Sequence, residues 1–320
     1  MSEYKTIHGI HVQALDTDPS NLGAGQVWYN TTSNQLKITA VSTSGAWATG
    51  GNMGTGREVF GSAGTQTAGL AFGSGYPTTT ATEHYDGSAW TAGGNMATGR
   101  FSLDGCGTQT AALGFGGYDG TSRLNDTEHY DGSAWTAGGN LGTARYHLAS
   151  CGTQTAALGF GGYGPDITNT TEHYDGSAWT AGGNMGTARS YLVGAGTETT
   201  ALGFGGYDGS ITNVTEHYDG SAWTAGGNMG TARYRLSGAG TQTAGLGFGG
   251  WNGSTYQNAT EHYDGSAWTA GGNMATAKYN LGGCGTQTAG LGFGGKTPSI
   301  TNATEEYAGP GITTQTVTSS

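Results

Sequence analysis

Residues 232–275 read ARYRLSGAGTQTAGLGFGGWNGSTYQNATEHYDGSAWTAGGNMA, and this stretch recurs along most of the 320-residue chain. The motif GTQT, or its variant GTET, occurs six times, and so does TEHY or TEEY. The Trp of GSAW (SGAW in the first copy) recurs every 43 to 45 residues, at Trp47, Trp90, Trp135, Trp179, Trp223 and Trp268. A repeat of this size is typical of a propeller blade or a solenoid unit.

Each repeat reads as four short strands. Within the quoted unit we predict strands over 234–240, 244–250, 260–264 and 267–270, because β-branched, aromatic and small residues there alternate with Gly, Asn and Asp turn clusters. A helical repeat would need an apolar period of 3.6 residues, which the unit lacks. Four antiparallel strands in about 44 residues are the size of one propeller blade.

Composition excludes other classes of protein. The chain holds 65 Gly but only 5 Pro, and Gly does not recur at every third position, which excludes collagen. Glycine spread along the chain also excludes a helical bundle, and a charged fraction of 10% is too low for a typical disordered chain. The net charge of −11 argues against nucleic acid as a partner. The sequence contains no apolar run of 18 residues, so membrane insertion is not expected.

The repeat resembles the kelch family. The resemblance rests on an Arg after a small-residue turn (Arg233), a double glycine (Gly249, Gly250), a Tyr-Asp pair (Tyr263, Asp264) and a Trp shortly after it, and it covers about residues 36–308. Membership would imply radial four-stranded blades with the first strand innermost. The family's usual Val and Leu in the second strand are replaced here by Ala, Gly and Phe.

The two ends of the array are out of phase. The first copy supplies only the last strand, at Trp47, whereas the final copy ends at Tyr307 without a following Trp. We therefore expect an all-β, six-bladed kelch-like propeller over residues 41–308, closed by strands from both ends in one blade. Residues 36–41 and 304–307 compete for the third strand of that blade. Residues 1–40 would form a short N-terminal extension and 309–320 a C-terminal tail.

Two charged positions recur in every copy. Sixfold rings could bind an ion or a polyanion on the axis, but a site used once should break the symmetry, so we expect each cation to pair with a glutamate or with turn carbonyls. The positions are Arg57, Arg100, Arg145, Arg189, Arg233 and Lys278, and Glu83, Glu128, Glu172, Glu216, Glu261 and Glu305.

No metal, cofactor or catalytic site is expected. Five histidines recur one residue before the Tyr of TEHY, but equivalent positions in adjacent blades lie too far apart to share a zinc ion. Cys106, Cys151 and Cys284 alternate with Ala at one repeat position and indicate buried packing. No GxSxG or HExxH motif is present, so an enzyme is not expected.

Variation between copies is concentrated in the loops between the second and third strands. Such loops, rich in aromatic and small polar residues, would suit an adhesive face for a sugar or protein, or they could simply drift without a role. We call the recurring Arg or Lys of each copy the ring cation. The residue directly after each ring cation belongs to a second variable set: Glu58, Phe101, Tyr146, Ser190, Tyr234 and Tyr279. The candidate binding residues in the loops are Tyr76, Tyr118, Asp119, Tyr163, Tyr207, Asp208, Trp251, Tyr256 and Lys296.

The N-terminal segment adds a second resemblance. Residues 16–38, DTDPSNLGAGQVWYNTTSNQLKI, resemble a segment of tail-fibre and other structural proteins of bacteriophages, and the glycine-rich kelch units are similar to virion proteins of marine phages. Trp28, Tyr29 and Leu36 would give a short apolar hairpin able to dock on the ring or on another virion subunit. The start, MSEYKTIHGIHVQ, has no apolar secretion signal.

These resemblances imply a non-enzymatic virion protein, present in several copies on the particle. The first expectation is a tail-fibre or receptor-binding appendage that presents its loops to a host surface glycan or protein and contacts other virion subunits through residues 1–40. A purely structural capsid or tail protein that binds only other virion subunits is the alternative, and a glycan-active enzyme is a third possibility.

Overall fold

The computed structural model describes residues 12–20, 23, 25–42, 44–75 and 77–317. Throughout these residues the regular structure is β-strand, and the strands form seven four-stranded sheets. The chain divides into two compact units, one of residues 46–308 and one that combines residues 1–45 with 309–320. The all-β class predicted from the sequence is confirmed, but the structure has one sheet more than the six expected.

Six sheets lie in the larger unit, each with antiparallel strands. The first and second are β5 (Gly61–Thr65), β6 (Ala68–Phe72), β7 (Thr82–Tyr85), β8 (Trp90–Ala92) and β9 (Asp104–Thr108), β10 (Ala111–Phe115), β11 (Thr127–Tyr130), β12 (Trp135–Ala137). The third and fourth are β13 (Ala149–Thr153), β14 (Ala156–Phe160), β15 (Thr171–Tyr174), β16 (Trp179–Ala181) and β17 (Val193–Gly196), β18 (Ala201–Phe204), β19 (Thr215–Tyr218), β20 (Trp223–Ala225). The fifth and sixth are β21 (Ser237–Thr241), β22 (Ala244–Phe248), β23 (Thr260–Tyr263), β24 (Trp268–Ala270) and β25 (Gly282–Gly285), β26 (Ala289–Phe293), β27 (Thr304–Ala308), β4 (Ala46–Thr49).

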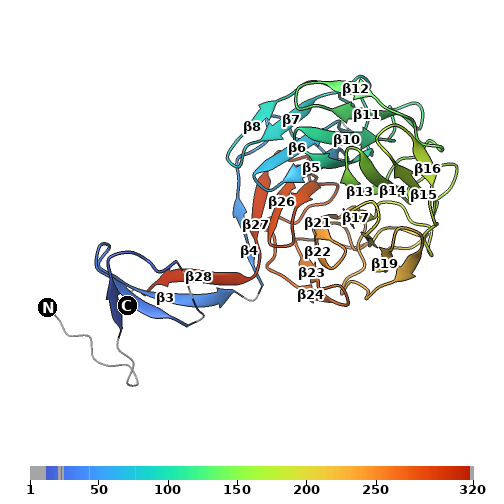
Figure 1. Cartoon of the computed structure of the whole chain (residues 1–320). Helices are drawn as coiled ribbons and strands as arrows, with labels where there is room; N and C mark the ends of the chain where they lie inside the picture. Colours follow the sequence, from blue (N-terminus) through green and yellow to red (C-terminus); the bar gives the residue numbers. More distant parts are fainter. Residues whose placement is uncertain (1–11, 21–22, 24, 43, 76, 318–320) are drawn as a thin grey trace. The chain divides into compact units, whose positions relative to one another are not determined.

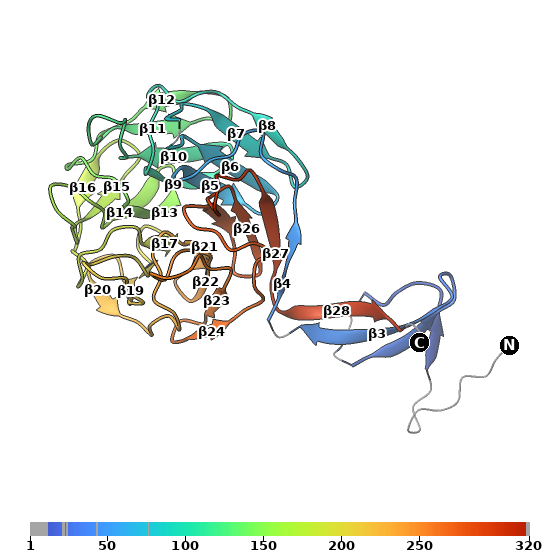
Figure 2. The same ribbon diagram turned by 180° about the vertical axis from the view of Figure 1, so that it is seen from behind.

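The six sheets are arranged around a common centre, as Figures 1 and 2 show from opposite sides. Their first strands contact one another in the order β5, β9, β13, β17, β21 and β25, and β25 in turn contacts β5. Each sheet remains a separate hydrogen-bonded ladder that does not close on itself. The arrangement is therefore propeller-like, with the sheets joined by packing and by hydrogen bonds outside the ladders.

The sixth sheet combines strands from both ends of the larger unit. β4 pairs antiparallel with β27, with Trp47 opposite Tyr307. Of the two segments that competed for the third place in this sheet, residues 304–308 occupy it, because residues 35–42 form β3 in the other unit.

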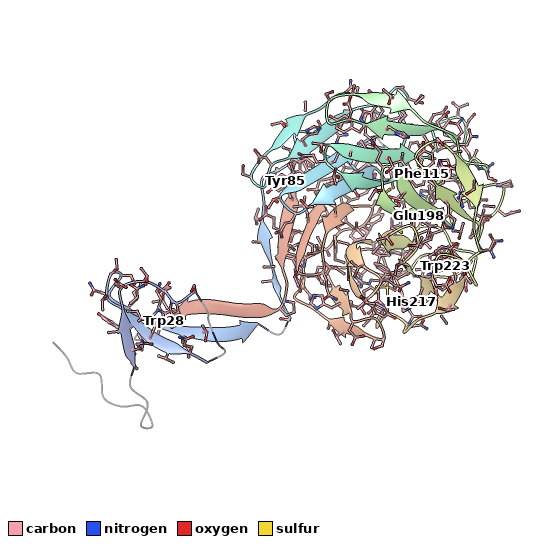
Figure 3. All side chains as sticks on the ribbon, viewed as in Figure 1. Trp28, Tyr85, Phe115, Glu198, His217 and Trp223 are labelled. Atoms are coloured by element: carbon pink, nitrogen blue, oxygen red, sulfur yellow. The ribbon has the colours of Figure 1, made fainter. Side chains whose placement is uncertain are left out.

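Adjacent sheets are joined by the repeated Trp. The Trp90 indole donates to Thr304 Oγ1 in the preceding sheet at 2.9 Å, and its ring lies 4.8 Å from that of Phe293. Trp223, which is labelled in Figure 3, repeats the arrangement with Thr171 and Phe160. The same indole bond occurs at all six junctions, at 2.9 to 3.0 Å. A buried indole N–H needs such a partner, so the motif fixes the spacing of neighbouring sheets.

A glycine in the GGN motif lets the sheets approach closely. A Cβ atom at Gly94 would lie 1.9 Å from the Ser133 carbonyl oxygen of the next sheet. Gly51 meets Ser88 at the same distance. No side chain fits there, which explains part of the high glycine content.

The glutamine of GTQT forms a further bond to the preceding sheet. Gln66 Nε2 donates to the carbonyls of Gly290 and Tyr307, which again joins the first sheet to the sixth. Glu198, which is labelled in Figure 3, replaces this glutamine in the fourth sheet and cannot donate. Its carboxylate instead lies 2.8 Å from His173 Nδ1. His173 Nε2 in turn lies 2.8 Å from the Tyr218 hydroxyl.

The smaller unit contains the seventh sheet, which the sequence analysis did not predict. Its strands are ordered β1 (Gln13–Leu15), β2 (Val27–Asn30), β3 (Gln35–Ser42) and β28 (Gly311–Thr316). The predicted hairpin is present, since Tyr29 pairs with Leu36. Residues 311–316, expected as a tail, instead pair with β3. Their sequence, GITTQT, holds one Ile among threonines, too weak an apolar pattern to indicate a strand.

The Asp18 carboxylate connects β2 and β3 of the smaller unit. Its carboxylate accepts hydrogen bonds from the indole of Trp28, which is fully buried, from the Asn30 amide and from Lys37 Nζ. The Lys37 bond is the main cause that lowers the pKa of Asp18 to about 2. Trp28 is thus buried within the smaller unit and hydrogen-bonded to its own segment.

Buried ion pairs anchor the connections between sheets in the larger unit. Arg233 Nη1 donates to the carbonyls of Gly249 and Ala259, and its Nη2 lies 2.7 Å from Glu261 Oε1. Glu261 Oε2 accepts the Gly230 amide of the same connection. Charge-assisted bonds of this kind are stronger than neutral ones. Equivalent pairs are Arg57–Glu83, Arg100–Glu128, Arg145–Glu172 and Arg189–Glu216.

Lys278 is the exception in this set. Its Nζ lies 3.1 Å from Glu305 Oε1, but neither atom has a hydrogen bond of acceptable geometry within the described chain. Burial lowers the pKa of Lys278, and the Glu305 charge opposes that shift. A lysine has a single terminal nitrogen, whereas an arginine has several N–H donors arranged in a planar fork.

The Lys278→Arg variant should therefore be more stable. A guanidinium can reach the carbonyls of Gly294 and Ala303, the equivalents of those that Arg233 uses, and this should raise the free energy of unfolding by about 1 to 2 kcal/mol. Urea unfolding of the full chain measures the change. The matched reverse variant, Arg233→Lys, should lose about as much. Equal stability of both variants and the parent would show that the carbonyl contacts contribute nothing.

Candidate functional site

One face of the larger unit collects the variable segments. First and third strands start from this face, and second and fourth strands return to it, because neighbouring strands in each sheet are antiparallel, including β4 beside β27 in the sixth sheet. It therefore carries the segments before each first strand and the loops between second and third strands. We call it the loop face. The GTQT and DGSAW turns lie at the opposite face.

A closed ring of backbone hydrogen bonds lies at the centre of the loop face. Six residues, each two positions after a ring cation, donate from N–H to the carbonyl of the preceding member at 2.6 to 3.2 Å. Val59 closes the ring by donating to Asn280. We call this set the axial ring: Val59, Ser102, His147, Tyr191, Arg235 and Asn280.

All six axial residues have left-handed backbone conformations, with φ between 52° and 57°. This region disfavours residues other than glycine, at a cost of about 1 to 3 kcal/mol each, and a β-branched valine is especially unfavourable there. In a chain with 65 glycines, none of the six positions is glycine and no two carry the same residue. The fold thus holds six unlike side chains in strained positions around one axis.

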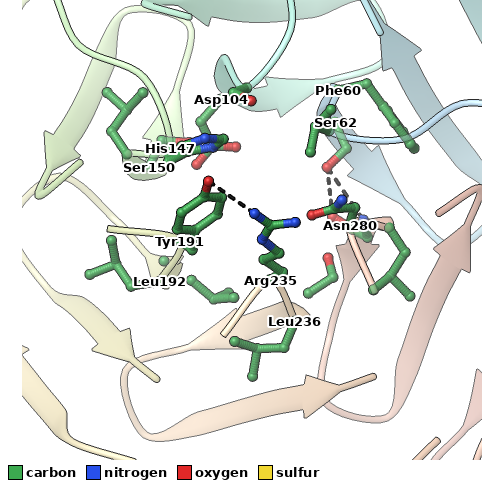
Figure 4. A pocket seen from close by; sticks show the side chains of 18 of the residues that line it. Phe60, Ser62, Asp104, His147, Ser150, Tyr191, Leu192, Arg235, Leu236 and Asn280 are labelled. Atoms are coloured by element: carbon green, nitrogen blue, oxygen red, sulfur yellow. Dashed lines mark hydrogen bonds between the residues drawn. The ribbon is translucent and has the colours of Figure 1, made fainter. Parts of the chain in front are cut away.

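These side chains line an axial cavity of about 140 Å³ (Figure 4). Below the axial ring the wall continues with the first strands, which contribute Asp104, Ser62, Ser150 and Ser237. The cavity is small, polar and lined by residues of all six sheets, and these residues differ from sheet to sheet.

Arg235 is the only cation that lines this cavity in the described chain. Its Nη2 donates to the Tyr191 hydroxyl at 3.1 Å, as the dashed line in Figure 4 shows. Its guanidinium carbon lies 4.5 Å from the Tyr191 ring centre and 5.2 Å from that of Tyr234. Arg235 Nε and Ser102 Oγ are buried without a hydrogen-bond partner. Stacking holds the guanidinium in place while part of its donor capacity stays unused.

Besides Tyr191, two titratable side chains share the cavity with Arg235. Burial, followed by the charge of Arg235, lowers the pKa of His147 well below 6.5, so this imidazole is neutral at pH 7. Its ring stacks on Tyr191 with centroids 3.6 Å apart. Burial raises the pKa of Asp104 to about 7, against the opposing bond from the Gly105 amide. Asp104 is thus partly protonated near neutral pH.

The loop residues singled out in the sequence surround this centre. Tyr118, Tyr163, Tyr207, Trp251 and Lys296 occupy one repeat position, and each pairs in a short bridge with a member of the second variable set. The bridges are Phe101 with Tyr118, Tyr146 with Tyr163, Ser190 with Tyr207, Tyr234 with Trp251 and Tyr279 with Lys296. The two variable sets are therefore one surface. Tyr76 lies outside the described residues.

Aromatic contacts continue from sheet to sheet across this surface. Trp251 lies 4.9 Å from Tyr256, which stacks on Tyr279 at 4.9 Å. Elsewhere Tyr118 lies 5.7 Å from Tyr146 of the next sheet. Around the axial ring, these pairs place aromatic side chains beside hydroxyl and amide groups.

A wider groove of about 630 Å³ lies between the second and third sheets on the loop face. Its lining includes Tyr118, Tyr146, Thr143 and Arg123. The Arg123 guanidinium lies 5.6 Å from the Tyr163 ring centre. The groove offers a second place where an aromatic ring and a cation adjoin.

The carboxylates of Asp119 and Asp208 accept hydrogen bonds within their own loops. Asp119 Oδ1 accepts the amides of Thr121 and Ser122 at 2.7 and 2.6 Å, and Asp208 Oδ1 accepts the Ser210 amide at 2.9 Å. Such Asx turns fix loop shape. The structure thus gives both carboxylates a turn-forming role.

Lys296 is connected to the axial ring through the Glu58 carboxylate. Lys296 Nζ lies 3.5 Å from Glu58 Oε1, and the Asn280 amide donates to Glu58 Oε2 at 2.9 Å. Glu58 is buried, whereas Lys296 remains partly exposed. A member of each variable set and a member of the axial ring therefore form one connected group.

The repeated histidines bridge sheets. His84 Nε2 lies 2.6 Å from the Tyr130 hydroxyl of the next sheet, and the other four copies are similar. The three cysteines are buried. Within the described residues no group of three or more His, Cys, Asp or Glu side chains could hold a metal ion, and no helix is long and apolar enough to cross a membrane.

Comparison with models of known protein families gives no match, and comparison with curated protein sequences gives none either.

Sequence reasoning missed the axial ring and Asp104. The signal was present, since the second residue after each ring cation differs in all six copies. Asp104 is the only acid at its repeat position, where the other copies carry Gly61, Ala149, Val193, Ser237 and Gly282. Their shared location on the axis required the structure.

The Asp104→Asn variant should change the pH dependence of stability. The carboxyl ionises near pH 3.8 when unfolded but near 7 when folded, so its contribution to stability is full below pH 4 and is lost as pH rises to 7. At pH 8 the variant should therefore be more stable, by up to about 4 kcal/mol before screening by cavity water. Urea unfolding at pH 4 and pH 8 measures this. An equal effect of the substitution at both pH values would contradict the assignment.

Proposed function

We propose that this protein is a non-enzymatic, receptor-binding component of a bacteriophage virion, most simply a tail-fibre appendage. In this proposal the larger unit is a six-bladed, kelch-type propeller, closed by the blade that β4 shares with β25, β26 and β27. Its loop face binds a host surface glycan or protein. Many copies on one particle would raise the avidity of individually weak contacts.

One observation carries the proposal. The six copies are nearly identical in the frame, by which we mean the strands and the repeated Trp, Gln, Arg and Glu contacts that hold the sheets together. They differ at the axial ring, the second variable set and the loops, and all three lie on the loop face. Drift alone would not place different side chains at six strained, enclosed positions. Aromatic rings beside hydroxyls and a guanidinium are a surface chemistry suited to sugars.

The smaller unit is proposed as the part that contacts other virion subunits. Residues 16–38 carry the tail-fibre resemblance, and Asp18 and Trp28 give that segment its own core. The alternative function, a capsid or tail component that binds only virion subunits, would use this unit in the same way and leave the loop face without a ligand.

A bacterial glycan array and a host adsorption assay test the proposal. The purified protein should bind surface glycans and compete with phage adsorption, and Trp251→Ala should weaken both at least fivefold. Thr288→Ala, an exposed change at the opposite face, is the matched control. A folded protein that binds no glycan or cell and does not compete would exclude the receptor role and favour the subunit-only alternative. Release of reducing sugar would overturn the non-enzymatic assignment.

A further inference from the structure

The cations of the larger unit fall into two groups. Five arginines and Lys278 are buried against glutamates in the frame. The remaining three, Arg123, Arg235 and Lys296, all lie on the loop face. The whole chain has a net charge of −11. The loop face therefore carries those positive charges of the larger unit that are not paired with the buried glutamates, and an anion would be attracted to this face.

The axial cavity supplies directed donors as well as charge. Arg235 Nε and Ser102 Oγ are both buried, both belong to residues that line the cavity, and both lack a partner. Ser102 is only 5% exposed, so bulk water does little to satisfy its hydroxyl. Some frame arginines also have an unpartnered Nε, but none of them lines this cavity.

Acidic groups near the cavity cancel this charge only in part at neutral pH. Glu58 is engaged by Asn280 and Lys296. Asp104 lines the cavity, but burial raises its pKa to about 7, so that its protonated form can itself donate a hydrogen bond. His147 is neutral and stacked on Tyr191.

We propose that the axial cavity binds the carboxylate of an acidic saccharide, with Arg235 as its principal partner and Ser102 as a second donor. The inference rests on the proposed function and names its ligand class. A cavity of about 140 Å³ is close to the volume that holds one benzene-sized group, so it takes the carboxylate end of a sugar rather than a whole ring. The remaining sugar would lie over Tyr234 and Tyr279, whose rings surround the Arg235 guanidinium at 5.2 and 5.8 Å.

Arg235 is prepared for this role. Its hydrogen bond to the Tyr191 hydroxyl and its contacts with three tyrosine rings fix the guanidinium before a ligand arrives. A fixed guanidinium loses little side-chain entropy on binding and offers two directed N–H groups to a carboxylate.

Isothermal titration of the full chain tests the inference with glucuronic acid and N-acetylneuraminic acid, against glucose and inorganic sulfate. At least one acidic sugar should bind at least tenfold more tightly than glucose and than sulfate. Arg235→Gln should weaken that binding at least tenfold, because the carboxylate loses a charge-assisted hydrogen bond. Lys37→Gln, the same charge change in the smaller unit, should alter it less than twofold. Asp104→Asn should tighten it severalfold at pH 8.

The controls separate the possible failures. Thermal melts establish that each variant is folded, and Arg235→Lys, which keeps the charge but loses Nε, should give intermediate affinity. Equal binding of acidic and neutral sugars, equal binding of sulfate, or equal losses in Arg235→Gln and Lys37→Gln would overturn the inference. Glycan-array binding confined to neutral glycans would overturn it while leaving the receptor function standing; absence of any glycan or cell binding would remove both.

Discussion

The ring of six backbone hydrogen bonds at the axis is the constraint on which the larger unit depends. Each bond joins consecutive sheets, and the bond from Val59 to Asn280 joins the first to the last. The ring sets a left-handed conformation at every member and so directs six side chains towards one axis. Indole, glutamine and histidine contacts repeat the same sheet-to-sheet connection further out. The symmetric frame therefore imposes the geometry, and the side chains on the axis are left to supply chemistry.

Much of the frame could be predicted from the sequence. The strands expected over 244–250 and 260–264 are observed at 244–248 and 260–263, since glycine clusters and alternating residues mark their ends. The equal recurrence of Arg and Glu anticipated paired charges because a buried cation needs a partner. The partnership of β4 with β27 followed from the phase of the repeat, which left a lone Trp at one end.

The rest could not be predicted because its signals are not local. The pairing of β3 with β28 joins segments some 280 residues apart, and GITTQT has no distinctive pattern. The axial ring was hidden because it lies outside any strand and its members share a conformation rather than a residue type. The sequence suggests Asp119 and Asp208 as ligand groups, yet each carboxylate accepts hydrogen bonds from backbone amides of its own loop. Sequence reasoning thus located the variable loops but not the centre that they surround.

The central claim is that frame and recognition are separable, with recognition concentrated on the axis. A variant with asparagine at all six axial positions tests it most directly, because Asn280 already occupies one of them and asparagine tolerates the left-handed region. Binding of this variant to acidic saccharide should be measured beside its thermal melt. The account predicts a cooperative melt and loss of binding. A folded variant that binds as tightly as the parent would contradict it.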